Sequence, residues 1–185
     1  MELSHLSASS LKTWKTCKLQ WYAEKVLDID RRPAHPLTRV GSAVHEAFEL
    51  SMEDRDTLSH LPEAYAKYDL HESDLQERAE NMTKTCIEWG WWDGVDQLDS
   101  CIAEQEFLIE AGSGVKLKGF IDRLDIKGNH ASVLDIKTQA RKFTKDELLN
   151  NLQASIYNIA ARRLNPNVVG PIRVEFWVLR HEIQA

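Results

Sequence analysis

Apolar residues recur at the spacing of amphipathic helices through the first half of the chain. The residues from Ser7 to Ser10 offer side-chain oxygens to unpaired backbone amides, which predicts that a helix begins there. Its apolar stripe consists of Leu11, Trp14, Leu19, Tyr22 and Val26. A second helix is expected to begin at Thr38 or Gly41. The residues expected on its buried side are Val40, Val44, Ala47 and Phe48.

Residues 53–92 are also predicted to be helical, and two local signals divide them. Pro62 suits the first turn of a helix, where a missing N–H breaks no hydrogen bond. The run from Ser73 to Gln76 has the spacing of a capping box, which predicts the start of another helix. Residues 89–94 are rich in tryptophan and glycine and break the helical pattern.

The second half of the chain alternates between apolar and polar residues, as half-buried strands do. Strands are predicted over residues 102–110, 115–126, 131–137 and 172–179, with the first three joined by tight turns into an antiparallel unit. Thr144 and Glu147 have capping-box spacing, so a helix is expected to follow them and to end at Asn165. Its apolar residues are Leu148, Leu149, Leu152, Ile156, Ile159 and Ala160.

Length and composition indicate one soluble globular domain with a substantial core. The chain has 185 residues, of which 43% are hydrophobic and 28% are charged. No apolar run has the length of a membrane span, and the N-terminal residues lack the pattern of a secretory signal. The three cysteines, Cys17, Cys86 and Cys101, are widely spaced and odd in number, which disfavours a disulfide framework. A cytoplasmic location is therefore expected.

The net charge of −6 does not indicate a nucleic-acid partner, but the basic residues are clustered. The clusters are Arg31 and Arg32 with Arg39, Arg141 and Lys142 with Lys145, and Arg162 with Arg163. Local basic patches bind phosphates even on an acidic protein, particularly where carboxylates are gathered around a metal. The alternative is that these clusters are solvated faces and turns.

Two carboxylates and a lysine give the strongest chemical signal. Asp135 and Lys137 are two apart on a predicted strand, so they share one face, and Asp122 lies on the preceding strand. Two adjacent carboxylates repel unless a cation lies between them, and hard oxygen ligands suit Mg²⁺ or Mn²⁺. Such an ion activates water and polarises a phosphoryl oxygen. The alternative is a surface aspartate in a cross-strand salt bridge.

Five short motifs follow one another between residues 7 and 157. They are Ser7-Ala8-Ser9-Ser10 followed by Cys17 and Trp21-Tyr22; Gly41-x-x-x-His45; Gly119-x-x-Asp122-Arg123; Asp135-x-Lys137-Thr138; and Gln153-x-x-x-Tyr157. No single motif is specific. The ordered set resembles the RecB-type branch of the PD-(D/E)XK nuclease superfamily, which also includes the CRISPR-adaptation nucleases.

The resemblance implies a role for each matching residue. It implies metal ligation by His45, Asp122 and Asp135, with the carbonyl of Ile136 as a fourth ligand. It makes Lys137 similar to the catalytic lysine of the family. Gln153 and Tyr157 would support the catalytic site and touch the DNA backbone, and Glu106 would assist. The remaining residues expected to contact DNA are Arg123, Thr138, Arg141 and Lys142.

Each implied role has a structural alternative. A histidine on a helix that carries Val44 and Phe48 is commonly a packing residue. Gln153 and Tyr157 are one helical turn apart and border an apolar stripe, so they would also serve as a polar cap over the core. The tryptophans of residues 89–92 would either stack on unpaired bases or pack in the core.

The sequence also departs from the family pattern. Many relatives hold an iron–sulfur cluster with one cysteine near the N-terminus and three near the C-terminus. Cys17 matches the first position, but no cysteine follows Cys101, so no iron–sulfur cluster is expected in this chain. Cys17 is then expected to be a small buried hydrophobe. Ile121 stands where the superfamily has its proline, and the chain lacks helicase motifs and a Walker-type loop, so unwinding would require a partner.

Taken with the resemblance, the sequence predicts an α/β fold: a restriction-endonuclease-like mixed central sheet flanked by helices. Residues 1–100 would form an N-terminal helical region and residues 101–185 the nuclease core, together one compact domain. The predicted function is a Mg²⁺- or Mn²⁺-dependent deoxyribonuclease, an exonuclease acting on single strands or DNA ends in recombination, repair or DNA processing. The alternatives are a non-catalytic DNA-end-binding or scaffold subunit, and a nuclease active only in complex with a helicase or integrase.

Overall fold

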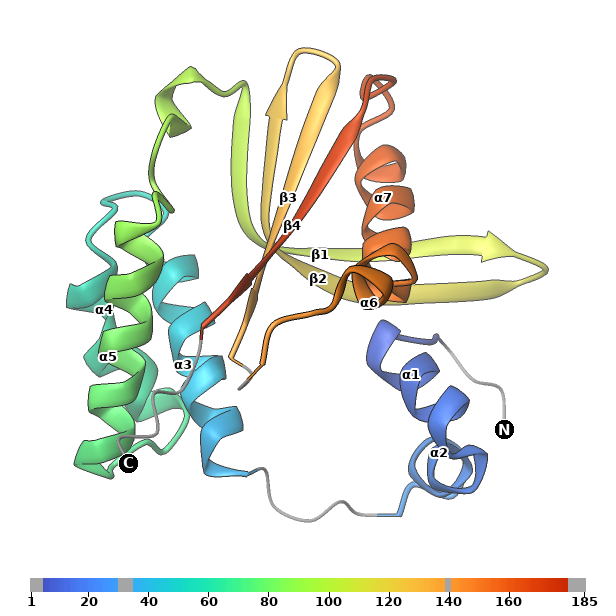
Figure 1. Ribbon diagram of the computed structural model, residues 1–185, viewed down its shortest axis with the longest axis horizontal. Helices are drawn as coiled ribbons and strands as arrows, with labels where there is room; N and C mark the ends of the chain where they lie inside the picture. The colour runs from blue at the N-terminus through green and yellow to red at the C-terminus, as the bar shows by residue number, and fades with distance from the viewer. Residues whose placement is uncertain (1–4, 30–34, 139–140, 180–185) are drawn as a thin grey trace.

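A four-stranded mixed sheet lies at the centre of the structure, a computed structural model that describes residues 5–29, 35–138 and 141–179 (Figure 1). The strands lie in the order β1-β2-β3-β4. Their bounds are Ser100–Gly112, Val115–Lys127, His130–Lys137 and Ile172–Val178. The first three strands are antiparallel neighbours, and β4 pairs parallel to β3. The prediction of a mixed sheet flanked by helices is therefore confirmed.

The parallel pairing of β4 requires a crossover, and two helices supply it rather than the single helix predicted. Helix α6 spans Lys145–Leu149 and α7 spans Leu152–Leu164. The capping box of Thr144 and Glu147 forms as expected. The break follows because Asn151 caps α7, its side chain accepting a hydrogen bond from the amide of Ala154. Leu148, Leu149 and Ile159 are exposed, so the predicted apolar stripe is only partly buried.

The first predicted helix is also two helices, α1 (Ala8–Thr16) and α2 (Lys18–Lys25). Cys17 has extended backbone angles and separates them, and its sulfur accepts a hydrogen bond from the amide of Gln20. Cys17 is exposed, which corrects the prediction that it is buried. Trp14, Leu19 and Tyr22, three residues of the predicted apolar stripe, are exposed as well.

Three longer helices pack together beside the sheet: α3 (Pro36–Leu50), α4 (Thr57–Lys67) and α5 (Ser73–Glu88). The predicted buried side of α3 is correct, because its four residues have at most 1% of their surface exposed. Pro62 lies inside α4 and not in its first turn. The predicted capping box at Ser73 does not form. Its partner Gln76 donates instead to the carbonyl of Leu70.

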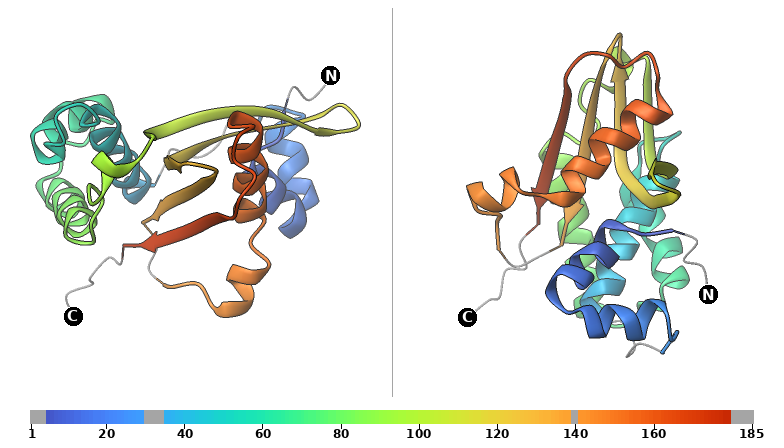
Figure 2. Two further views of the ribbon diagram at one scale, coloured as in Figure 1. Left: turned by 90° about the horizontal axis from the view of Figure 1, so that it is seen from above. Right: turned by 90° about the vertical axis from the view of Figure 1, so that its right-hand side faces the viewer.

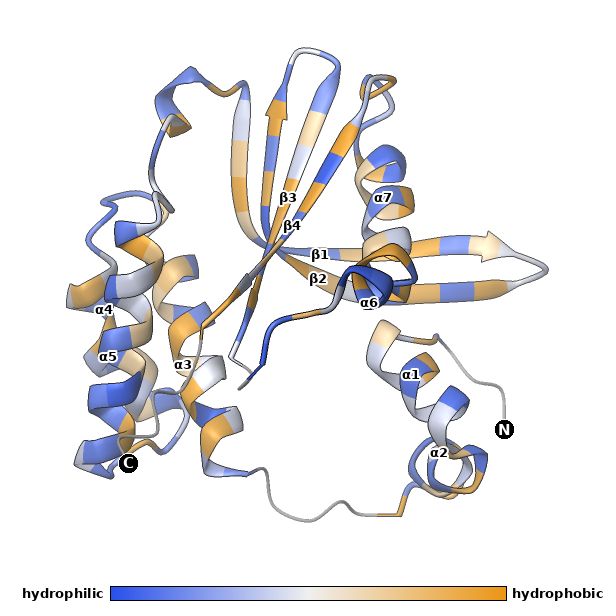
Figure 3. Cartoon of the chain, in the orientation of Figure 1, coloured by the Kyte–Doolittle hydropathy of each residue, from blue (hydrophilic) through white to orange (hydrophobic). Residues whose placement is uncertain are grey.

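Alternate residues of β3 enter two different hydrophobic cores, one on each face of the sheet (Figures 2 and 3). Leu134 and Ile136 join the α3–α5 core, which includes Val44, Phe48 and Trp91. Val133 joins the α7 core with Ile156 of α7.

Because β3 contributes residues to both cores, these cores position β3 relative to α3–α5 and to α7. The N-terminal segment reaches the second half of the chain through Leu6, which forms a parallel β-bridge with Leu117. Hydrophobic contacts thus cross residue 100, and the division of the chain there stays a prediction. Among the described helices, none has the length and apolar character that crossing a membrane requires.

Candidate active site

Three side chains from separate elements converge where α3 approaches the sheet. The Nδ1 atom of His45, on α3, lies 2.8 Å from Oε1 of Glu104 on β1 and 3.5 Å from Oδ2 of Asp122 on β2. One ligand atom from each of the three residues lies within 4.8 Å of the others. His45 is therefore held by polar partners and not by apolar packing alone.

Asp135 lies beside this cluster and is completely buried. Its Oδ1 accepts hydrogen bonds from the hydroxyl of Tyr157 (2.7 Å) and from Nε2 of Gln153 (3.0 Å). Lys137 Nζ lies 2.7 Å from Oδ2, yet this oxygen accepts no hydrogen bond from the described residues. The backbone amide of Ile136 donates to Oδ2 of Asp122 (2.6 Å), which links the two aspartates through β3. Gln153 and Tyr157 thus orient a carboxylate rather than only covering the core.

Glu104 is a site residue that the sequence did not reveal. Its φ of +46° is in the left-handed region, and it is skipped in the pairing of β1 with β2 between Ala103 and Gln105. This conformation is uncommon for a residue with a side chain and occurs preferentially at functional sites. The predicted assistant, Glu106, is exposed and ion-paired with Lys118, and its role stays a prediction.

The charges of the cluster perturb one another's ionisation. Burial disfavours the charged form of His45, but the attraction of Asp122, Glu104 and Asp135 outweighs it and raises the pKa of His45 to about 9. Burial, with further repulsion from Asp135 and Glu104, raises the pKa of Asp122 to about 7. Burial beside Asp135 also raises the pKa of Tyr157, so its hydroxyl keeps the proton that it donates. Without a bound cation, the negative charges of this cluster therefore favour the protonated forms of His45 and Asp122.

These residues fit a divalent metal ion. They combine an imidazole with carboxylates, and oxygen-rich donor sets of this kind suit Mg²⁺ or Mn²⁺. The buried Oδ2 of Asp135 is ion-paired with Lys137 but accepts no hydrogen bond from the described residues, so it has the capacity to bind an ion as well. The side chains that would orient the ligands are also present, because Tyr157 and Gln153 fix the Asp135 carboxylate.

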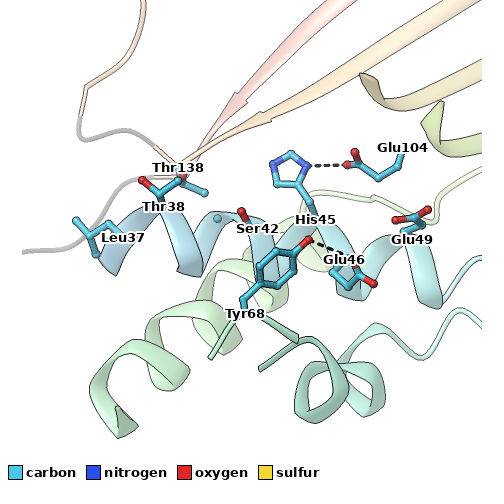
Figure 4. A pocket seen from close by; sticks show the side chains of 10 residues that line it. Leu37, Thr38, Ser42, His45, Glu46, Glu49, Tyr68, Glu104 and Thr138 are labelled. Carbon is cyan, nitrogen blue, oxygen red and sulfur yellow. Dashed lines mark hydrogen bonds and ion pairs between the residues drawn. The ribbon is translucent and has the colours of Figure 1, made fainter. Parts of the chain in front are cut away.

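A pocket of about 570 Å³ opens next to this cluster, along one side of α3 (Figure 4). His45 and Glu104 lie in its wall. The other lining residues are Leu37, Thr38, Gly41, Ser42, Glu46, Glu49, Tyr68 and Thr138. We call it the α3 pocket.

Gly41 permits α3 to approach the end of β3. A Cβ atom at this position would lie 2.9 Å from Oγ1 of Thr138, closer than side chains normally pack. The glycine of the second motif and the threonine of the fourth therefore meet at one point in the wall of the α3 pocket.

The basic residues predicted to contact DNA differ in their exposure to solvent. Arg123 is buried, pairs with Asp125 (2.8 Å) and lies over the ring of Trp91, so the structure corrects its assignment as a DNA contact. Arg141 is exposed and forms two hydrogen bonds with Glu147, and Lys142 is exposed. The predicted basic residues Arg31 and Arg32 lie outside the described part of the chain.

The tryptophans divide between packing and exposure. Trp91 is fully buried, with its ring centroid 4.3 Å from that of Phe48. Trp92 also packs against this pair, whereas Trp89 is half exposed and contacts Trp177 edge-on. Packing rather than base stacking explains Trp91.

The family model described as the PD-(D/E)XK nuclease superfamily matches residues 5–185 of the chain. Among solved structures, the crystal structure of protein VC1899 from Vibrio cholerae aligns with a TM-score of 0.34 and 11% sequence identity. The alignment covers 94% of this chain and 48% of that one, so the chain spans about half the length of that protein. None of the curated protein sequences matches the chain.

Proposed function

The chain belongs to the PD-(D/E)XK nuclease superfamily, whose members are generally metal-dependent nucleases, and we propose that it hydrolyses DNA phosphodiester bonds with Mg²⁺ or Mn²⁺. The observation that carries the proposal is the convergence of His45, Glu104 and Asp122 next to a buried Asp135. A fold alone does not imply a reaction, whereas these donors support a metal ion at the place where the reaction would occur.

The residues that would hold the ion are His45, Glu104, Asp122 and Asp135, with the backbone carbonyl of Ile136 as a further ligand. The bound ion would lower the pKa of a water molecule and polarise a phosphoryl oxygen.

Lys137 supplies a positive charge at this site. Its side chain is 26% exposed, and its ammonium group contacts Asp135 on one side and lies 5.9 Å from the ring centroid of Phe176. The ammonium would offset the charge that develops on the phosphate during attack. Tyr157 and Gln153 act before that step, because they hold the Asp135 carboxylate in one orientation.

We further propose that the enzyme is an exonuclease acting on single strands or DNA ends, as part of recombination, repair or DNA processing. Its partner would be a helicase or an integrase, and a helicase would supply duplex opening. Thr138 in the wall of the α3 pocket and the exposed Lys142 would contact the strand near the cleavage position.

The experiment is metal-dependent cleavage of end-labelled single-stranded and duplex DNA. The wild type should cut with Mg²⁺ or Mn²⁺ and not with a chelator, and Lys137→Ala should slow cleavage about 100-fold or more. Lys118→Ala is the matched control, because Lys118 is also a strand lysine paired with a carboxylate but lies outside the site. A wild type without activity, alone and with a helicase partner, would favour the DNA-end-binding scaffold.

Resistance of circular single strands would identify an exonuclease. Cutting of circles would reject that part of the proposal and leave the metal-dependent chemistry intact.

A further inference from the structure

The α3 pocket is larger than the metal cluster needs. It continues from His45 and Glu104 past Ser42 to Thr38 and Leu37, with Tyr68 forming part of the wall (Figure 4). We propose that this pocket binds one unpaired nucleotide of the DNA strand, its phosphate at the His45–Glu104 end and its base between Ser42 and Tyr68. The inference rests on the proposed function, because that function brings a phosphate to the metal cluster.

The size of the pocket fits this occupant. Pockets that enclose small organic ligands have volumes of about 300–1,000 Å³, and the α3 pocket has about 570 Å³. An ion and its water molecules would leave most of this space unused. A nucleotide attached to the phosphate under attack would fill the space next to it.

The charge of the pocket wall indicates whether the phosphate or the base of a nucleotide would lie against it. Glu46, Glu49 and Glu104 contribute three carboxylates to the wall, and no lysine or arginine is among its described lining residues. Without a metal, such a wall repels phosphate, so a phosphate belongs at the metal end. The amino groups and ring N–H groups of bases are hydrogen-bond donors, and carboxylates accept from them.

Glu46 has an acceptor left for such a donor. The ammonium of Lys67 (2.5 Å) and the hydroxyl of Tyr68 (3.3 Å) both contact its Oε2 atom. These two contacts hold the buried side chain in place and leave Oε1 without a hydrogen bond among the described residues. The ring of Tyr68 supplies an aromatic wall, which accepts any base because every base has a flat apolar face.

A base can enter this pocket only after it leaves its partner strand. Occupancy of the pocket would therefore favour single strands and frayed ends over intact duplex. This gives the proposed preference for single strands a location at Ser42 and Tyr68, next to the residues that would hold the ion.

The test compares two probes that share a phosphate and a deoxyribose and differ in the base. Deoxyadenosine 5′-monophosphate and 2-deoxyribose 5-phosphate are titrated into the Mg²⁺-loaded protein by calorimetry. The base-bearing probe should bind at least about fivefold more tightly, the lower end of what stacking on one aromatic ring contributes. Equal affinity for the two probes, or no binding of either, would overturn the proposal.

Ser42→Leu tests the location, because a larger side chain at this position fills the pocket. It should abolish the difference in affinity between the two probes, whereas Ser59→Leu, the same change at an exposed position of α4, should keep it. A folded Ser42→Leu protein that still prefers the base-bearing probe would overturn the proposed site.

If Ser42→Leu does not fold, the location is tested in the wild type by the change in backbone amide chemical shifts when each probe is added. The amides of Gly41, Ser42 and Tyr68 should move with the nucleotide and not with the sugar phosphate, and unmoved amides would overturn the site. Failure of the proposed function is recognised separately. If the protein is not a nuclease, DNA stays uncut while the base-dependent binding persists. If DNA is cut but binding does not depend on the base, only the proposed nucleotide pocket is rejected.

Discussion

Replacing Tyr157 by phenylalanine removes one hydroxyl and keeps the ring that packs in the α7 core. The ring of Tyr157 meets that of Phe107 edge-on, with centroids 6.4 Å apart, and phenylalanine preserves this contact. The hydroxyl donates to Oδ1 of Asp135 (2.7 Å) and accepts from Nε2 of Gln153 (2.5 Å). In the variant, Gln153 is the remaining side-chain donor to Oδ1 among the described residues.

The size of the effect follows from that single lost bond. A hydrogen bond to a charged group contributes about 1.5–3 kcal/mol. If the bond holds Asp135 in the orientation that a metal requires, this corresponds to about a 10- to 150-fold loss in metal affinity. Changes in residues that orient metal ligands typically cost about 10- to 100-fold, which agrees with this range.

The assay is calorimetric titration of Mn²⁺ into wild type, Tyr157→Phe and Tyr65→Phe. Tyr65 is the matched control, because its hydroxyl donates to the backbone carbonyl of Gln76 (3.0 Å), away from the cluster. Tyr65→Phe should lower the free energy of unfolding by about 0.5–1.5 kcal/mol and leave metal affinity unchanged. Equal Mn²⁺ affinities for wild type and Tyr157→Phe would refute the reasoning that the hydroxyl orients a ligand.

Three other predictions use the same cluster and its surroundings. Glu104→Gln should lower metal affinity at least about tenfold, whereas Glu106→Gln, two residues along the same strand, should change it less than about twofold; equal effects would remove Glu104 from the ligand set. Because the pKa of His45 is raised from 6.5 to about 9, the stability that its charge provides is complete below pH 6.5 and is lost as the pH rises to about 9. A metal must displace this proton, so the increase in Tm produced by Mg²⁺ should grow across that range, and an increase independent of pH would contradict it. Gly41→Ala should lower the free energy of unfolding by about 1–3 kcal/mol in urea denaturation, because the new Cβ meets Thr138; an unchanged midpoint would mean that this contact relaxes freely.

The alternation of residues predicted the sheet well, because its signal is local. Strand bounds differ from the prediction by only a few residues, and the buried side of α3 follows the spacing of Val40, Val44, Ala47 and Phe48. The helix breaks at Cys17 and Asn151 were missed because a residue that caps a helix also fits within a longer helical pattern. The box at Ser73 failed because Gln76 finds a backbone partner, Leu70, that only the folded chain provides.

The candidate site was predictable to the extent that motifs mark it. His45, Asp122 and Asp135 with Lys137 were named from motif spacing, and the structure brings them together. Glu104 carries no such mark, because its place depends on one left-handed backbone conformation within β1. Arg123 was misassigned because a sequence does not show whether an arginine faces solvent or, as here, Asp125 and Trp91.

The alternation along β3 has a consequence for the whole molecule. His45 lies on α3, which packs in the α3–α5 core, while Asp135 accepts a hydrogen bond from Tyr157 of the α7 core, so the proposed ligands are positioned from two different cores. An ion bound between them would act as a cross-link whose strength depends on how firmly both cores are docked against the sheet. A substitution that loosens either core, far from the proposed ligands, would then weaken metal binding before it unfolds the protein.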